Sequence, residues 1–179
     1  MRPVLLGKAV PSRYDGGLRT SRPHAMQTPT PFIRPLASHD LEAVLRVQAA
    51  CYPPAMQEPA AVVAARIGEA GDTGFVATAG GVVLAYAFAY RSTLGAVTPL
   101  GAGFSVAGAP DTLYLHDLAV SPAAAGGGLA RRLAARVAAL AQHEGLPWCA
   151  LVSVQDSRRF WERLGYAAAS CADGAASGR

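Results

Sequence analysis

The chain has 179 residues, 51% of them hydrophobic, and a formal net charge of +4. This length and apolar content fit one domain with a buried core and exclude a wholly disordered chain. The sequence has no run of about 18–20 apolar residues, so we expect no membrane-spanning helix and no membrane partner.

The first 25 residues hold the excess positive charge. They carry five basic residues and one acidic residue, whereas residues 26–179 carry eleven of each. Their prolines and glycines, with no apolar period, predict a disordered tail, and Met26 is an alternative start of the chain. Because nucleic-acid-binding proteins concentrate basic residues on a folded face or a helix, we expect no nucleic-acid partner.

From residue 31 onward, apolar residues recur at strand and helix spacings. The expected elements are a strand at 32–36, a helix from about 40 to 52, a second helix ending near residue 71, a hairpin of 75–79 and 82–91, a loop at 94–110, a strand at 112–120, a helix from 129 to about 143, a strand at 148–154 and a short helix at 156–164. This order predicts a mixed α/β domain at residues 26–170, followed by a flexible C-terminus at 171–179.

The three cysteines, Cys51, Cys149 and Cys171, are an odd number at wide spacing. They predict neither a disulfide framework nor a zinc site, and they are typical of a reducing compartment. We therefore expect a cytoplasmic protein without a bound metal, in which the thiols are inert packing residues.

The most informative stretch runs from Leu118 to Arg131, where a strand leads into three consecutive glycines and then into a helix. The first N–H groups of a helix lack intrahelical acceptors, and the helix dipole adds positive charge there. Glycines let the backbone approach an anion closely, so the stretch predicts a diphosphate site. A tight turn without a ligand is the alternative. The residues after Gly128 do not fit a P-loop, and the third glycine of a dinucleotide fingerprint is missing.

Two motifs in this sequence resemble those of the GNAT superfamily of acetyl-CoA-dependent N-acetyltransferases. The family's cofactor motif, (Arg/Gln)-x-x-Gly-x-(Gly/Ala), is matched by Ala125-x-x-Gly128-x-Ala130 after Val120-Ser121-Pro122. The family's late helix is similar to residues 157–166, which keep its aromatic–glycine frame. The resemblance covers residues 32–166 and implies a mixed α+β fold with a central, mostly antiparallel sheet flanked by helices. It also implies acetyl-CoA as co-substrate.

By this resemblance, the cofactor-binding residues come from the strand end, the glycine loop and the late helix. They are Leu118, Ala119, Val120, Ala125, Gly126, Gly127, Gly128, Leu129, Ala130, Arg131, Ser157, Phe160 and Trp161.

The strand before the loop, residues 114–120, is similar to the His-x-His-x-Leu-Ala-Val strand of arylalkylamine N-acetyltransferases, whose histidines relay the amine proton. His116 aligns with the second histidine, and Tyr114 takes the place of the first. An ordinary histidine pKa near 6.5 suits a base at neutral pH, so His116 and Tyr114 are the candidate catalytic residues. A core histidine is the alternative for His116. We expect Asp117 on the opposite face, unless a bulge interrupts the strand.

Three features depart from the family pattern. Ala125 replaces an arginine or glutamine, and losing such a charge-assisted contact weakens binding by roughly 1–3 kcal/mol. Trp161 stands where many relatives carry a tyrosine acid, and an indole cannot transfer a proton at neutral pH. Residues 167–179 contain no β-branched residue. We therefore expect the C-terminal strands to be missing, truncated or supplied by a partner.

The leading interpretation is transfer of an acetyl group from acetyl-CoA to a primary amine of a small molecule or a peptide, with a homodimer as one option. One alternative is a catalytically degenerate module that binds acyl-CoA. The other is an interaction protein that works through its basic tail.

Overall fold

The structure is a computed structural model that describes residues 4–10, 30–154 and 156–169. Its strands are β1 (Val4–Ala9), β2 (Phe32–Pro35), β3 (Phe75–Ala79), β4 (Val82–Ser92), β5 (Thr112–Val120), β6 (Trp148–Ser153) and β7 (Ala167–Ala168). Its helices are α1 (Leu41–Cys51), α2 (Ala60–Glu69), α3 (Leu129–His143) and α4 (Arg158–Glu162).

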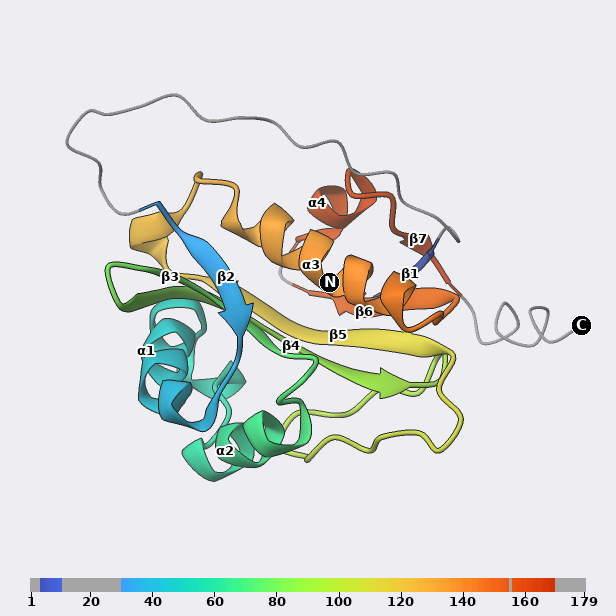
Figure 1. Cartoon of the computed structure of the whole chain (residues 1–179), viewed down its shortest axis with the longest axis horizontal. Helices are drawn as coiled ribbons and strands as arrows, with labels where there is room; N and C mark the ends of the chain where they lie inside the picture. The colour runs from blue at the N-terminus through green and yellow to red at the C-terminus, as the bar shows by residue number, and fades with distance from the viewer. Residues whose placement is uncertain (1–3, 11–29, 155, 170–179) are drawn as a thin grey trace, which may run out of the picture.

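The seven strands form one sheet in the order β2-β3-β4-β5-β6-β1-β7. All neighbouring strands are antiparallel except β5 and β6, which run parallel. Helices α1 and α2 cover one face of the sheet, and α3 and α4 cover the other (Figure 1). The expected mixed α+β fold with a mostly antiparallel sheet is therefore confirmed.

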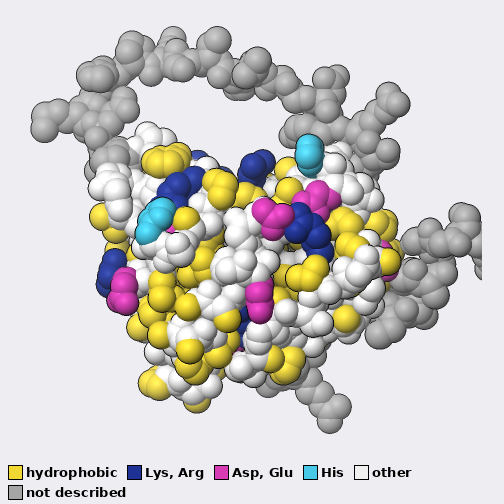
Figure 2. All heavy atoms as spheres, turned by 60° about the horizontal axis from the view of Figure 1, so that its bottom comes forward, with side chains coloured by type: hydrophobic (Ala, Val, Ile, Leu, Met, Phe, Trp, Pro, Cys, Tyr) yellow, Lys and Arg dark blue, Asp and Glu magenta, His cyan; other side chains and the backbone are white. Residues whose placement is uncertain are grey.

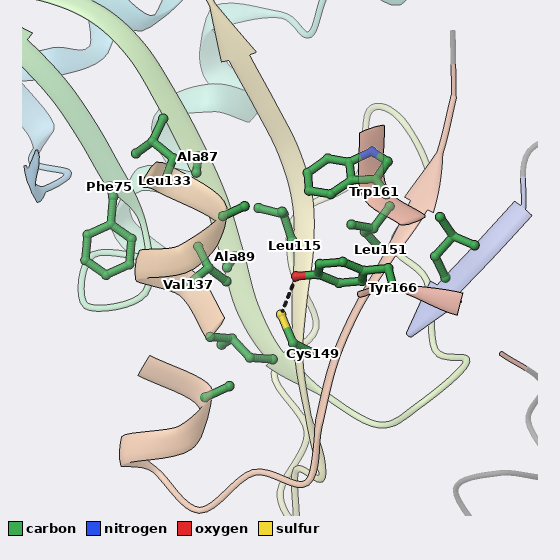
Figure 3. Close-up of a cluster of buried hydrophobic side chains, with 14 of the residues drawn as sticks. Phe75, Ala87, Ala89, Leu115, Leu133, Val137, Cys149, Leu151, Trp161 and Tyr166 are labelled. Atoms are coloured by element: carbon green, nitrogen blue, oxygen red, sulfur yellow. Dashed lines mark hydrogen bonds between the residues drawn. The ribbon is translucent and has the colours of Figure 1, made fainter. Parts of the chain in front are cut away.

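The sequence of β4 explains why the two faces differ. Aromatic residues and alanines alternate along residues 85–90, so bulky rings point to one face and methyl groups to the other. The alanine side lies in the core beside Leu133 and Val137 of α3, where small side chains let the helix approach the sheet (Figure 3). The aromatic side packs under α1 and α2.

The prediction of a disordered tail over residues 1–25 is wrong for Val4–Ala9, which form β1. This strand lies between β6 and β7, and its Leu6 is fully buried. The apolar pair Leu5-Leu6 explains the difference, because it supplies a strand whose burial offsets the entropy of ordering it. Residues 11–29 and 170–179 lie outside the described residues, and so do Met26 and the expected flexible C-terminus.

The C-terminal strand is short, as expected, because β7 has only two residues. The sheet beyond β6 is thus built mainly by β1, which comes from the other end of the chain. In the part of the chain that the structure describes, no helix is long and apolar enough to cross a membrane. On the face shown in Figure 2, basic side chains lie close to acidic ones and do not gather into a basic patch.

Candidate functional site

A cleft opens where β5 and β6 separate. Their parallel pairing covers only Thr112–Leu115 and Trp148–Leu151, yet β5 continues to Val120. Beyond the last pair lies a cavity of about 300 Å³. Its walls come from the end of β5, the end of β6 and α4; they include Leu118, Val120, Val152, Val154, Ser157 and Trp161.

A β-bulge shapes the β5 wall of this cleft. Phe88 pairs with Asp117 and the next residue, Ala89, pairs with Leu115, so His116 is the extra residue. The bulge shifts the alternation by one position, and His116 and Asp117 both line the cleft. The expectation that Asp117 faces away from His116, which assumed a regular strand, is therefore wrong.

Asp117 is the centre of a partly buried polar cluster. Its Oδ1 accepts a hydrogen bond from the Tyr52 hydroxyl at 2.5 Å, and its Oδ2 accepts one from the Tyr86 hydroxyl at 2.6 Å. Burial raises the pKa of the Asp117 carboxyl above its ordinary value, although the two hydrogen bonds act in the opposite direction. Burial also raises the pKa of both tyrosines, so the hydroxyls stay protonated and keep donating.

His116 lies beside this cluster in apolar surroundings. Its side chain is 9% exposed, and its ring meets that of Phe104 edge-on with 5.2 Å between centroids. Burial, helped by the nearby Arg66 charge, lowers the pKa of His116 to about 3. The imidazole is therefore neutral at pH 7, and its Nε2 lies 3.9 Å from Glu58 Oε1, too far for a hydrogen bond.

A second cavity of about 180 Å³ meets the first at His116 and Asp117. A buried ion pair forms part of its wall: Arg66 Nη1 lies 2.6 Å from Glu58 Oε1. The same two side chains fix the loop between β4 and β5, because Arg66 donates to the Ala102 carbonyl and Glu58 accepts from the Gly101 N–H. Leu100 of this loop also lines the second cavity, and its side chain is 62% exposed.

Sequence reasoning missed Glu58 and Arg66, and it missed the contact between Tyr52 and Asp117. Glu58 and Arg66 lie eight residues apart on either side of a helix start, and no motif marks them. Tyr52 lies 65 residues from Asp117 in the chain, so only the fold brings their side chains together.

The glycine loop is exposed, and the groups that it offers to a ligand are backbone N–H groups. Gly126 and Gly128 have φ values of +79° and +74°, a left-handed conformation that favours glycine, and a Cβ at either position would meet nothing within 4 Å. Gly128 is also the N-cap of α3, and no side chain caps that helix. No side-chain cap therefore satisfies the first N–H groups of this 15-residue helix, which leaves them available to an anion.

The late helix contributes Trp161, which is 7% exposed. Its Nε1 donates to Ser157 Oγ at 3.2 Å. Its ring meets the rings of Phe160 and Tyr166 edge-on, and Figure 3 shows it beside Tyr166. The indole N–H is thus already occupied, and the side chain forms a wall of the cleft.

The structure brings most of the predicted site residues together. The first cavity is lined by His116, Leu118, Val120, Ala130, Ser157, Phe160 and Trp161. Tyr114 lines the second cavity behind His116. Ala119 faces the core under α1, and Leu129 is buried, so only their backbones can contribute. Ala125, Gly126, Gly127, Gly128 and Arg131 are exposed. Among the described residues, no group of three or more His, Cys, Asp or Glu side chains could hold a metal ion.

Comparisons with known proteins bear on the family and the fold. Residues 41–166 match the family model described as the acetyltransferase (GNAT) family. No curated protein sequence matches the chain.

Several solved structures share the fold. The ribosomal-protein-S18-alanine N-acetyltransferase from Escherichia coli has a TM-score of 0.59 at 20% identity, over 79% of this chain and 80% of that one. Aminoglycoside N-acetyltransferase AAC(6')-Iy in complex with CoA has a TM-score of 0.56 at 18% identity, over 79% and 88%. The GphF GNAT-like decarboxylase in complex with isobutyryl-CoA has a TM-score of 0.54 at 22% identity, over 62% of this chain and 58% of that one. The match thus spans under two thirds of the GphF chain, and at these identities the likeness shows the fold.

Proposed function

Because the chain belongs to the GNAT acetyltransferase family, we propose that it transfers an acetyl group from acetyl-CoA to a primary amine of a small molecule or a peptide. The observation that carries this proposal is the meeting of two cavities at Asp117 and His116. One cavity lies between β5 and α4 on the side of the glycine loop, and the other is walled by Glu58 and the loop between β4 and β5. A reaction between two molecules needs such an arrangement, because each substrate then reaches the same atoms from its own side.

The glycine loop is the proposed site of the cofactor's pyrophosphate. Backbone N–H groups of Gly126–Arg131 would hold it, and the exposed Arg131 adds charge nearby. The pantetheine arm would follow the apolar cleft between β5 and β6, past Leu118, Val152 and Trp161. This path ends at the bulge, where the thioester would lie beside Asp117.

The acceptor amine would enter through the second cavity as an ammonium ion. Glu58 is paired with Arg66, whereas both hydrogen-bond partners of Asp117 are neutral tyrosines, so we place the ammonium ion beside the Asp117 carboxylate. Asp117 would accept one proton from the ammonium and leave a neutral amine. The amine nitrogen then attacks the thioester carbonyl, the C–S bond breaks, and the second proton leaves with the sulfur as a thiol.

His116 and Tyr114 take supporting roles in this scheme. With a pKa of about 3, His116 is a weak proton acceptor, so we assign the proton to Asp117 and keep His116 as a neutral hydrogen-bonding group beside the amine. Tyr114 packs against the His116 ring, 6.4 Å between centroids, and limits its movement. The likeness to arylalkylamine N-acetyltransferases stays a prediction.

Calorimetric titration of acetyl-CoA and CoA into the full chain tests the cofactor site. We expect saturable micromolar binding that weakens at least about a hundredfold in Gly128→Glu, since the substitution adds strain and a like charge. Gly145→Glu is the matched control, because Gly145 is exposed at the far end of α3, has a φ of +70° and also has nothing near its added Cβ. A folded sample that binds neither compound contradicts the proposal. Binding without turnover of any amine in a broad panel favours the degenerate acyl-CoA-binding module instead.

A further inference from the structure

The strand β1 fills a slot in the sheet that the rest of the chain leaves open. It pairs with β6 over six residues on one side and with β7 over two residues on the other (Figure 1). It also lies outside the region that matches the family, which begins at residue 41. Without it, the outer edge of β6 would carry unpaired backbone groups, which attract another strand.

The slot fits this strand side chain by side chain. Leu6 is fully buried in the same core as Trp161 and Tyr166. Gly7 lies so close to the C-terminal segment that an added Cβ would be 3.1 Å from the Ala169 Cβ. Lys8 Nζ donates to the Leu164 carbonyl at 3.0 Å, just beyond the end of α4. The sequence Leu6-Gly7-Lys8 is thus matched to the slot.

The attachment of β1 is local, whereas its connection to the body is long. Its further backbone hydrogen bonds run to Pro147 and from Ala169, the two ends of the segment that forms the slot. Residues 10–31 separate it from β2 and, fully extended, span about 70 Å. A connection of this length is long enough to reach the same slot in a second molecule, and the backbone partners of β1 among the described residues all lie within 147–169.

We propose that β1 is an exchangeable strand: two copies of this chain can trade it, each β1 filling the slot between β6 and β7 of the other copy. Such an exchange preserves every contact of the slot and needs no new interface. It also makes each cleft depend on the other copy. Leu5 pairs with Val152 of the cleft wall, and Val4 pairs with Ser153, whose Oγ lies 3.1 Å from Ser157 Oγ.

Disulfide cross-linking at the β1–β6 register tests the exchange, because Lys8 pairs directly with Cys149. Opposite residues of an antiparallel pair have Cα atoms about 4.5–5.5 Å apart, which a disulfide can bridge. One chain would carry Lys8→Cys with Cys149→Ala, and the second would keep Lys8 and Cys149. Both would have serine in place of Cys51 and Cys171. After co-refolding with oxidised and reduced glutathione, a covalent heterodimer forms only where β1 of the first chain lies in the slot of the second.

The heterodimer should depend on concentration. Flexible tethers give effective concentrations in the millimolar range, so we expect a trace at about 10 μM protein and tens of per cent at about 1 mM. A mixture in which both chains carry Cys149→Ala sets the background. A single chain with Lys8→Cys and the native Cys149 must close its own disulfide at about 10 μM.

Two results would overturn the proposal. No heterodimer at about 1 mM, beside a complete disulfide in the single-chain control, shows that the strand never leaves its own molecule. Failure of the single-chain disulfide shows that Lys8 and Cys149 are not paired, so the slot itself is wrong. The test does not depend on catalysis, and its outcome is independent of the proposed acetyl transfer.

Discussion

The glycine loop and the junction at Asp117 are built in opposite ways. The loop, residues 126–128, is exposed and offers backbone groups alone, and an added side chain at Gly126 or Gly128 would touch nothing. The junction is partly buried, and its chemistry comes from side chains: the Asp117 carboxylate on β5 and the hydroxyls of Tyr52 and Tyr86 that donate to it. A backbone site depends on local conformation, whereas a side-chain site depends on the whole fold. The two should therefore respond differently to substitution.

Asp117→Asn should give the largest difference between the two regions, because it should impair catalysis at the junction without affecting acetyl-CoA binding at the loop. We expect kcat/KM to fall at least about a hundredfold, because the amine loses its proton acceptor, while the affinity for acetyl-CoA stays unchanged. Steady-state kinetics and calorimetry measure the two quantities. Asp72→Asn is the control, since Asp72 is a surface carboxylate that pairs with Arg91.

A second readout distinguishes a base from a merely structural carboxylate. Amines that are already neutral at the assay pH need no deprotonation, so the deficit of Asp117→Asn should shrink as the amine pKa falls. An equal deficit for all amines, or a loss of acetyl-CoA binding, would mean that Asp117 only holds Tyr52 and Tyr86 in place.

His116→Gln should change the acid stability of the junction without touching the loop. The pKa of His116 is about 3 in the folded chain and about 6.5 when unfolded, so folding disfavours its protonation. Its contribution to stability is therefore fully present above pH 6.5 and is lost as the pH falls towards 3. Between pH 7 and 4.5 the wild type should lose about 2 kcal/mol more unfolding free energy than the variant.

Urea unfolding at the two pH values measures this difference. His39→Gln serves as control, because the His39 side chain is 73% exposed and should behave like the wild type. Parallel losses in the wild type and in His116→Gln would show that His116 titrates normally in the folded chain.

Ala125→Arg should raise the affinity of the glycine loop for acetyl-CoA without changing the chemistry at Asp117. An arginine beside the proposed pyrophosphate adds a charge-assisted contact, and we expect acetyl-CoA to bind about tenfold tighter, with a stronger dependence on salt. Calorimetry at two salt concentrations measures the gain. Ala123→Arg, with the same charge at an exposed position two residues earlier, is the matched control. Equal gains in both variants would mean general attraction rather than a specific contact.

The sequence predicted what depends on local pattern. The boundaries of β3, β4, β5 and α3 agree closely with the expected ranges, because apolar periods and glycines define them. The glycine loop before α3 was predicted for the same reason, and its role in cofactor binding stays a prediction. The bulge at His116 could not be predicted, because a strand with one extra residue has the same composition as a regular strand. The role of β1 was missed as well. The prolines and arginines after residue 10 are typical of a disordered segment, and they outweighed the six residues that form the strand.

The bulge makes β5 two short strands of opposite phase. Before His116, Leu113 and Leu115 face α3, and after it Leu118 and Val120 do, an odd number of positions further on. Removing His116 would therefore leave the faces of the other residues as they are: Leu113, Leu115, Leu118 and Val120 would alternate regularly on the α3 side, and Asp117 would stay on the opposite side beside Tyr86. The extra residue adds one side chain to the cleft and moves none of the others. The imidazole thus lies next to Asp117 on the same face because β5 is one residue longer than its pairing with β4 needs.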